Sequence, residues 1–65
     1  MTTFEALVSM SQTVLRQRGQ WQGGATAYDD IDLVVNQCAD LLPEPTRNLC
    51  DMAIAELKRR AGGPA

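Results

Sequence analysis

The sequence of 65 residues contains no histidine and only one Phe, one Tyr and one Trp. Without histidine, Ser9 and Ser11 have no evident general base, so the nucleophile and base pair of a hydrolase has no candidate members. The glycines between residues 19 and 24 match neither a phosphate-binding loop nor a dinucleotide-binding fingerprint. We therefore expect a protein that is not an enzyme and holds no cofactor.

Metal-binding residues are scarce as well, because the chain has only two cysteines. Two cysteines without a histidine cannot complete a tetrahedral site within one chain. The acidic cluster of Asp29, Asp30 and Asp32 lacks the spacing of a calcium-binding loop, and it suits the positive N-terminal end of a helix. We predict no metal site.

Long apolar runs are also missing, since no stretch approaches the roughly 20 residues of a membrane span. The first residues, Met1–Glu5, lack the basic region and the apolar stretch of a signal peptide. We expect a cytoplasmic protein with no membrane partner. In that compartment Cys38 and Cys50 are interpreted as buried thiols, and a disulfide that joins two helices is the alternative.

What the chain does contain is helical periodicity in three segments. Thr2 and Glu5 have the spacing of a capping box, and Gly19 is a typical helix stop. Pro43 and Pro45 separate the second segment from the third. The expected helices cover about residues 3–18, 27–42 and 45–61, and residues 62–65 form a flexible tail.

These segments predict one all-α domain of residues 1–65. The second and third helices form an antiparallel hairpin across the proline turn. The apolar arc of the second helix is expected to include Leu41 and Leu42. A chain of this size buries only about 60% of its unfolded surface, so we also expect a homodimer that adds buried area.

With no catalytic or cofactor motif, contact with a larger protein is the favoured function. Five residues are candidates for that contact: Trp21 lies in a glycine-rich loop, Met10, Leu33 and Met52 lie off the main apolar stripes, and Arg59 is near the third helix end. Trp21 has a second interpretation, in which its indole covers one end of the core. We expect a regulator that modulates or inhibits a larger protein, of the kind that bacteria or phages encode.

A helix-turn-helix regulator is the alternative function. Eight acidic and six basic residues give a net charge of −2, which disfavours binding to nucleic acid of any sequence. A specific contact remains open, because the third helix starts with Arg47 and Asn48 and ends with Lys58, Arg59 and Arg60. Nucleic acid is therefore kept as the second candidate partner.

Overall fold

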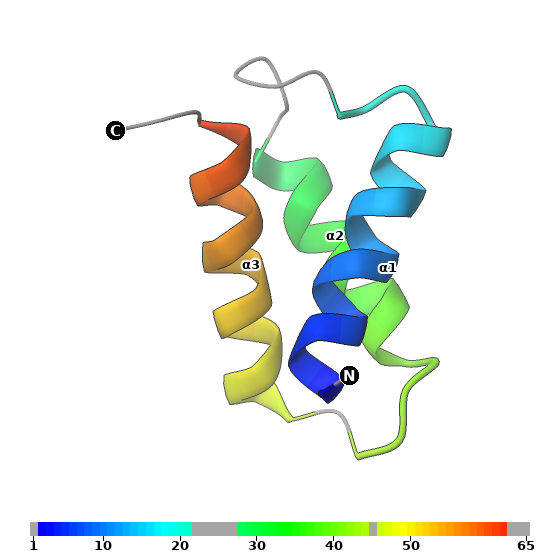
Figure 1. Cartoon of the computed structure of the whole chain (residues 1–65), viewed down its shortest axis with the longest axis vertical. Coiled ribbons are helices and arrows are strands. Elements are labelled where there is room, and N and C mark those ends of the chain that lie inside the picture. Colours follow the sequence, from blue (N-terminus) through cyan, green and yellow to red (C-terminus); the bar gives the residue numbers. More distant parts are fainter. Residues whose placement is uncertain (1, 22–27, 45, 63–65) are drawn as a thin grey trace.

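The computed structural model describes residues 2–21, 28–44 and 46–62, which form three α-helices. These are α1 (Thr3–Gln17), α2 (Tyr28–Ala39) and α3 (Arg47–Ala61), and every pair of helices is in contact. α1 and α3 run in the same direction and α2 runs in the opposite direction (Figure 1). The predicted all-α, three-helix domain with an antiparallel hairpin of the second and third helices is confirmed.

The first helix begins where its capping residues indicate. The Thr2 hydroxyl accepts a hydrogen bond from the Glu5 backbone N–H at 3.1 Å, and the Glu5 carboxylate accepts one from the Thr2 N–H at 3.1 Å. The bond from the Thr2 backbone favours the charged carboxylate and lowers the pKa of Glu5. This capping box satisfies two amides that a helix N-terminus leaves unpaired.

The same helix ends in a Schellman motif. Gly19 has a φ of 71°, and its N–H donates to the Arg16 carbonyl at 3.1 Å. The Gln20 N–H donates to the Leu15 carbonyl at 2.8 Å. Glycine suits this left-handed position because it has no Cβ to clash. The helix stop predicted at Gly19 is confirmed, with the last helical residue one position earlier than expected.

The predicted end of the second helix, at residue 42, is wrong. α2 ends at Ala39, and the Leu41 N–H then donates to the Cys38 carbonyl at 3.0 Å, in a tighter turn. Pro43 accounts for this, because it has no N–H to bond to the Ala39 carbonyl four residues earlier, and a proline ring clashes with a helical carbonyl at that position. Leu41 thereby leaves the apolar arc and is 75% exposed, contrary to expectation. The expected start at residue 27 lies outside the described residues.

The third helix begins two residues later than predicted, because Thr46 is its N-cap. Thr46 has extended backbone, and its hydroxyl accepts a hydrogen bond from the Leu49 N–H at 3.0 Å. Arg47 is therefore the first helical residue. Pro45 and the tail residues 63–65, where we expect a flexible end, lie outside the described residues.

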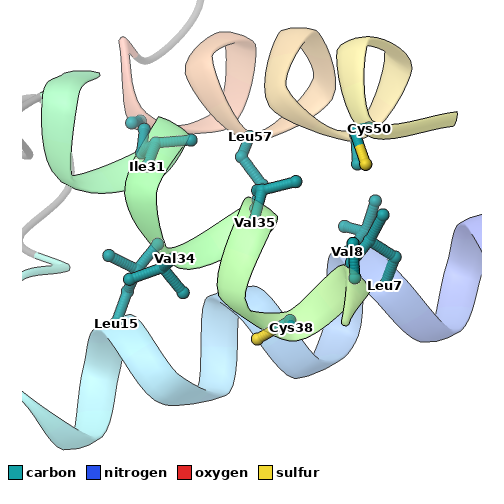
Figure 2. Close-up of a cluster of buried hydrophobic side chains, with 12 residues drawn as sticks. Leu7, Val8, Leu15, Ile31, Val34, Val35, Cys38, Cys50 and Leu57 are labelled. Atoms are coloured by element: carbon teal, nitrogen blue, oxygen red, sulfur yellow. The ribbon is translucent and has the colours of Figure 1, made fainter. Parts of the chain in front are cut away.

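The core lies between the three helices and draws apolar side chains from each of them. Leu57 points from α3 toward α2 near Val35, and Leu15 points from α1 toward Val34 (Figure 2). The buried apolar residues are Leu7, Val8, Leu15, Ile31, Val34, Val35, Cys38, Ala39, Cys50, Ala53, Leu57 and Ala61. Among the described residues, Ser11 is the one buried side chain that is polar.

A helix that spans a membrane has to be both long and apolar. In the described part of the chain, no helix has both the length and the apolar character needed to cross a bilayer.

Candidate functional site

Three large apolar side chains are exposed in the described part of the chain. Leu33 is 55% exposed on α2, Met52 is 49% exposed on α3, and Leu41 is 75% exposed in the turn after α2. Leu33 and Met52 were predicted from their positions off the apolar stripes. Leu41 was missed, because the sequence pattern placed it on the buried arc of a longer helix.

The other three predicted contact residues have contacts within the chain. Trp21 and Met10 are half-buried, and both pack against the hydrophobic core. The Arg59 guanidinium donates two hydrogen bonds to the Glu56 carboxylate, at 3.0 and 2.7 Å. The five predicted residues come from all three helices and the first loop, and of the two hollows described below, one is lined by Leu33 and neither by the other four. For Trp21, its packing favours the interpretation that the indole covers the core.

Leu33 lies on the outward side of α2, with Gln37 about one helical turn after it, and Leu41 lies in the turn that follows the helix end at Ala39. The turn bond to Cys38 keeps Leu41 near the end of the helix. Beside Leu33, a shallow hollow of about 380 Å³ lies between α2 and α3. The hollow is lined by Leu33, Asn36, Gln37, Ala39, Asp40, Thr46, Arg47 and Cys50.

Carboxylates are frequent in the sequence around these two leucines. From residue 19 to residue 46 the sequence has five acidic residues and neither a lysine nor an arginine. The Asp32 carboxylate lies 3.3 Å from Lys58 Nζ. The other four, which are Asp29, Asp30, Asp40 and Glu44, form no ion pair with any described residue. We name Leu33, Gln37 and Leu41 with these four carboxylates the acidic α2 face. A count of charges along the sequence could have identified it.

The basic residues predicted for DNA contact at the end of α3 lie next to carboxylates. Lys58 pairs with Asp32 at 3.3 Å, while Arg59 and Arg60 bind the Glu56 carboxylate at 2.7 and 2.6 Å. These neighbours offset much of the positive charge that phosphate contacts use.

At the start of the same helix, Arg47 and Asn48 are both exposed. Arg47 lines the hollow beside Leu33, and the Asn48 amide donates a weak hydrogen bond to Met52 Sδ at 3.7 Å. The two ends of α3 thus differ in charge. Arg47 at its start is an exposed cation, whereas the cations at its end lie next to carboxylates. DNA binding through this helix stays a prediction.

Glu56 is the centre of the largest charged cluster. Its hydrogen bonds from Arg59 and then Arg60 stabilise the ionised form and lower the pKa of Glu56 to about 2. The folded pKa lies below the usual value of 4.5, so the interaction stabilises the fold above pH 4.5. This contribution is lost as the pH falls from 4.5 through about 2.

A Glu56→Gln variant tests this pH dependence. Urea unfolding followed by circular dichroism between pH 7 and pH 2 gives the free energy of unfolding of each protein. We expect the variant to be less stable than wild type above pH 4.5, and the difference to shrink toward pH 2. Glu44→Gln is the matched control, because Glu44 is exposed and has no ion pair with a described residue. A difference that does not change with pH contradicts this role of Glu56.

A second hollow, of about 490 Å³, lies between α1 and α3. On its rim Arg60 donates to Glu56 and, through Nη1, to the Gln12 side-chain oxygen at 3.0 Å. Glu5, also on the rim, is held in the capping box. Within the hollow, Gln12, Glu56 and Arg60 therefore bind one another, while Arg16 has no ion pair with a described residue.

The two cysteines are free thiols, and both are buried. In Figure 2 the Cys50 side chain points from α3 toward Val8, and the Cys38 sulfur lies on a different side of α2. The two sulfurs do not face each other, so the alternative of a disulfide between Cys38 and Cys50 is not what the structure contains. The small apolar role favoured from the sequence agrees with their place in the core.

Burial predicts how these thiols react. With Ellman's reagent we expect little reaction in the native protein and two thiols per chain in denaturant, because Cys38 is 4% exposed and Cys50 is 7% exposed. The absorbance of the released thiolate gives the count. Fast reaction without denaturant, or fewer than two thiols in denaturant, contradicts two free buried cysteines.

Metal ligands are also absent as a cluster in the described part of the chain. No group of three Cys, Asp or Glu side chains is placed there to hold an ion. Asp29 and Asp30 lie in the first turn of α2, where carboxylates complement the positive end of a helix.

The chain has no significant match among protein-family models, curated proteins or solved structures.

Proposed function

We propose that this chain is a small, non-enzymatic protein-interaction module. It binds a larger protein in the cytoplasm and modulates, or inhibits, that protein in the manner of a small bacterial or phage regulator. The observation that supports the proposal is the exposure of Leu33, Leu41 and Met52 outside a core that the inner faces of the helices already fill. Buried free thiols are consistent with a reducing compartment.

Energetics support a binding role for these side chains. Burying a leucine or methionine contributes roughly 1.5–3 kcal/mol, and here that contribution is not used by the fold. Methionine also adapts to irregular partner surfaces. A partner that covers all three side chains therefore gains affinity without changing the core.

Affinity capture followed by quantitative mass spectrometry tests the function. The bait is wild type, a Leu33→Ser/Leu41→Ser/Met52→Ser variant, or a control with Ser9→Ala and Thr13→Ala on α1. We expect a reproducible partner that is retained by the control and reduced about ten-fold or more by the triple variant.

Two results contradict the proposal. In the first, no protein is enriched by wild type over empty resin. In the second, the triple variant captures the same protein as strongly as wild type, although circular dichroism shows that it is folded.

We also propose that the chain forms a homodimer, as the small core suggests. Light scattering across micromolar concentrations tests it, with twice the mass of the chain expected. A strict monomer over that range contradicts the dimer but does not contradict the proposed interaction with another protein.

A further inference from the structure

We infer that the partner docks a basic amphipathic segment on the acidic α2 face. The inference rests on the proposed interaction function and names the chemistry of the partner. It follows from two observations, the exposure of Leu33 and Leu41 and the presence close to them in sequence of four carboxylates that have no ion pair with a described residue.

Four carboxylates belong to this face. Asp29 and Asp30 precede Leu33 by about one turn, and Asp40 and Glu44 lie beside and beyond Leu41. None of these four carboxylates has an ion-pair partner among the described residues. A ligand with lysines or arginines is attracted by such a surface and orients on it.

Three basic residues border this face, and one of them is Lys58, which lies 3.3 Å from Asp32. On the α1 side, Arg18 Nη1 donates to Gln37 Oε1 at 3.3 Å. On the α3 side, Arg47 lines the hollow that Leu33 also lines. The negative charge is thus centred on α2 itself, and the ligand's cations are expected to lie over the middle of the face.

The apolar part fits a helix. Leu33 is exposed on α2 and Leu41 is exposed two residues after the helix end, so a ligand that covers both has to extend along the face. An amphipathic helix offers several apolar side chains along one side, at its positions i, i+3, i+4 and i+7. Its lysines or arginines would flank these side chains and meet the carboxylates of the face.

Other occupants fit this charge poorly. An anionic membrane and a nucleic acid both carry phosphates, which the carboxylates repel. A second copy joined through the same face about a two-fold axis would bring like carboxylates together. The charge therefore favours a basic protein segment.

Fluorescence anisotropy with a synthetic peptide tests the inference on the full chain. The probe is a labelled amphipathic 15-residue peptide of leucine and lysine, and the matched control has glutamate for lysine. We expect micromolar binding of the Leu/Lys peptide that weakens as salt rises, and binding of the Leu/Glu peptide that is about ten-fold weaker or more.

Variants locate the binding surface. Leu33→Ala with Leu41→Ala is expected to weaken the Leu/Lys peptide about ten-fold. Asp40→Asn with Glu44→Gln is expected to weaken it several-fold and to reduce the salt dependence. The matched control is Ala55→Ser with Asp51→Asn, which changes an exposed apolar residue and removes a carboxylate on α3, and it should bind like wild type. Circular dichroism confirms that each variant is folded.

Several outcomes overturn the inference. They are equal binding of the two peptides, equal loss in the α3 control, and an unchanged Kd in both α2 variants. Self-association that disappears with Leu33→Ala and Leu41→Ala, with no effect on peptide affinity, assigns the face to a second copy instead.

The capture experiment separates this inference from the broader function. A captured protein that is lost with Met52→Ala but kept with Leu33→Ala and Leu41→Ala overturns the basic-segment inference and preserves the interaction module. Capture of no protein overturns the interaction module itself.

Discussion

Replacing Leu57 by alanine is expected to lower the free energy of unfolding by about 3 kcal/mol. Leu57 is fully buried, and its side chain points from α3 toward α2 near Val35 (Figure 2). The smaller side chain loses transfer free energy and leaves a cavity between the helices. A domain of this size has a total stability on the order of 5 kcal/mol, so the variant should melt well below wild type.

Leu33→Ala is the matched control for this substitution. It makes the same chemical change at a leucine that is 55% exposed, and its expected cost is below about 1 kcal/mol. Urea unfolding followed by circular dichroism gives both values. An equal loss in the two variants, or no loss in Leu57→Ala, contradicts the assignment of Leu57 to the core.

Local sequence signals predicted α1 well. Thr2 and Glu5 form their capping box within four residues of one another, and Gly19 ends the helix through bonds to residues just before it. Both devices are short in range, so they depend little on how the rest of the chain folds. This is why the first helix begins at the predicted residue and ends within one residue of its predicted end.

The end of α2 was less predictable. The apolar pattern continues through Leu41 and Leu42, whereas Pro43 stops the helical geometry before them. Periodicity says which residues would share a face if the helix continued, and it does not say where the helix ends. The error placed Leu41 in the core and removed from the candidate site its most exposed apolar residue.

Trp21 shows a different limit of prediction from the sequence. The sequence left this residue with two interpretations, because a loop tryptophan can cover a core or bind a partner. Its packing against the core depends on how α1 and α2 meet, which local patterns do not encode. The acidic α2 face was within reach of the sequence, since the absence of basic residues between positions 19 and 46 needs no tertiary information.

Pro43 connects the fold with the proposed site. The same proline that ends α2 exposes Leu41 beside unpaired carboxylates, so one local constraint both closes the hairpin and creates the apolar part of the acidic α2 face. The core does not depend on that face. Substitutions there should change binding far more than stability, which makes the two properties separable by experiment.

Replacing Ser11 by alanine is expected to raise the free energy of unfolding by about 1–2 kcal/mol. The Ser11 side chain is fully buried in α1, and its hydroxyl oxygen has no hydrogen-bond partner among the described residues. Alanine removes this unpaired polar group, and it is also the better helix former. The loss of one oxygen atom leaves only a small cavity, so the gain in stability should exceed the cost of that cavity.

Ser9→Ala separates the two contributions, because Ser9 lies on the exposed side of the same helix. It should gain only the difference in helix propensity, about 0.5 kcal/mol. Thermal and urea unfolding of both variants measure the difference between their free energies of unfolding. If Ser11→Ala is no more stable than Ser9→Ala, the buried hydroxyl is not a source of instability. If it is less stable than wild type, the hydroxyl supports the native core.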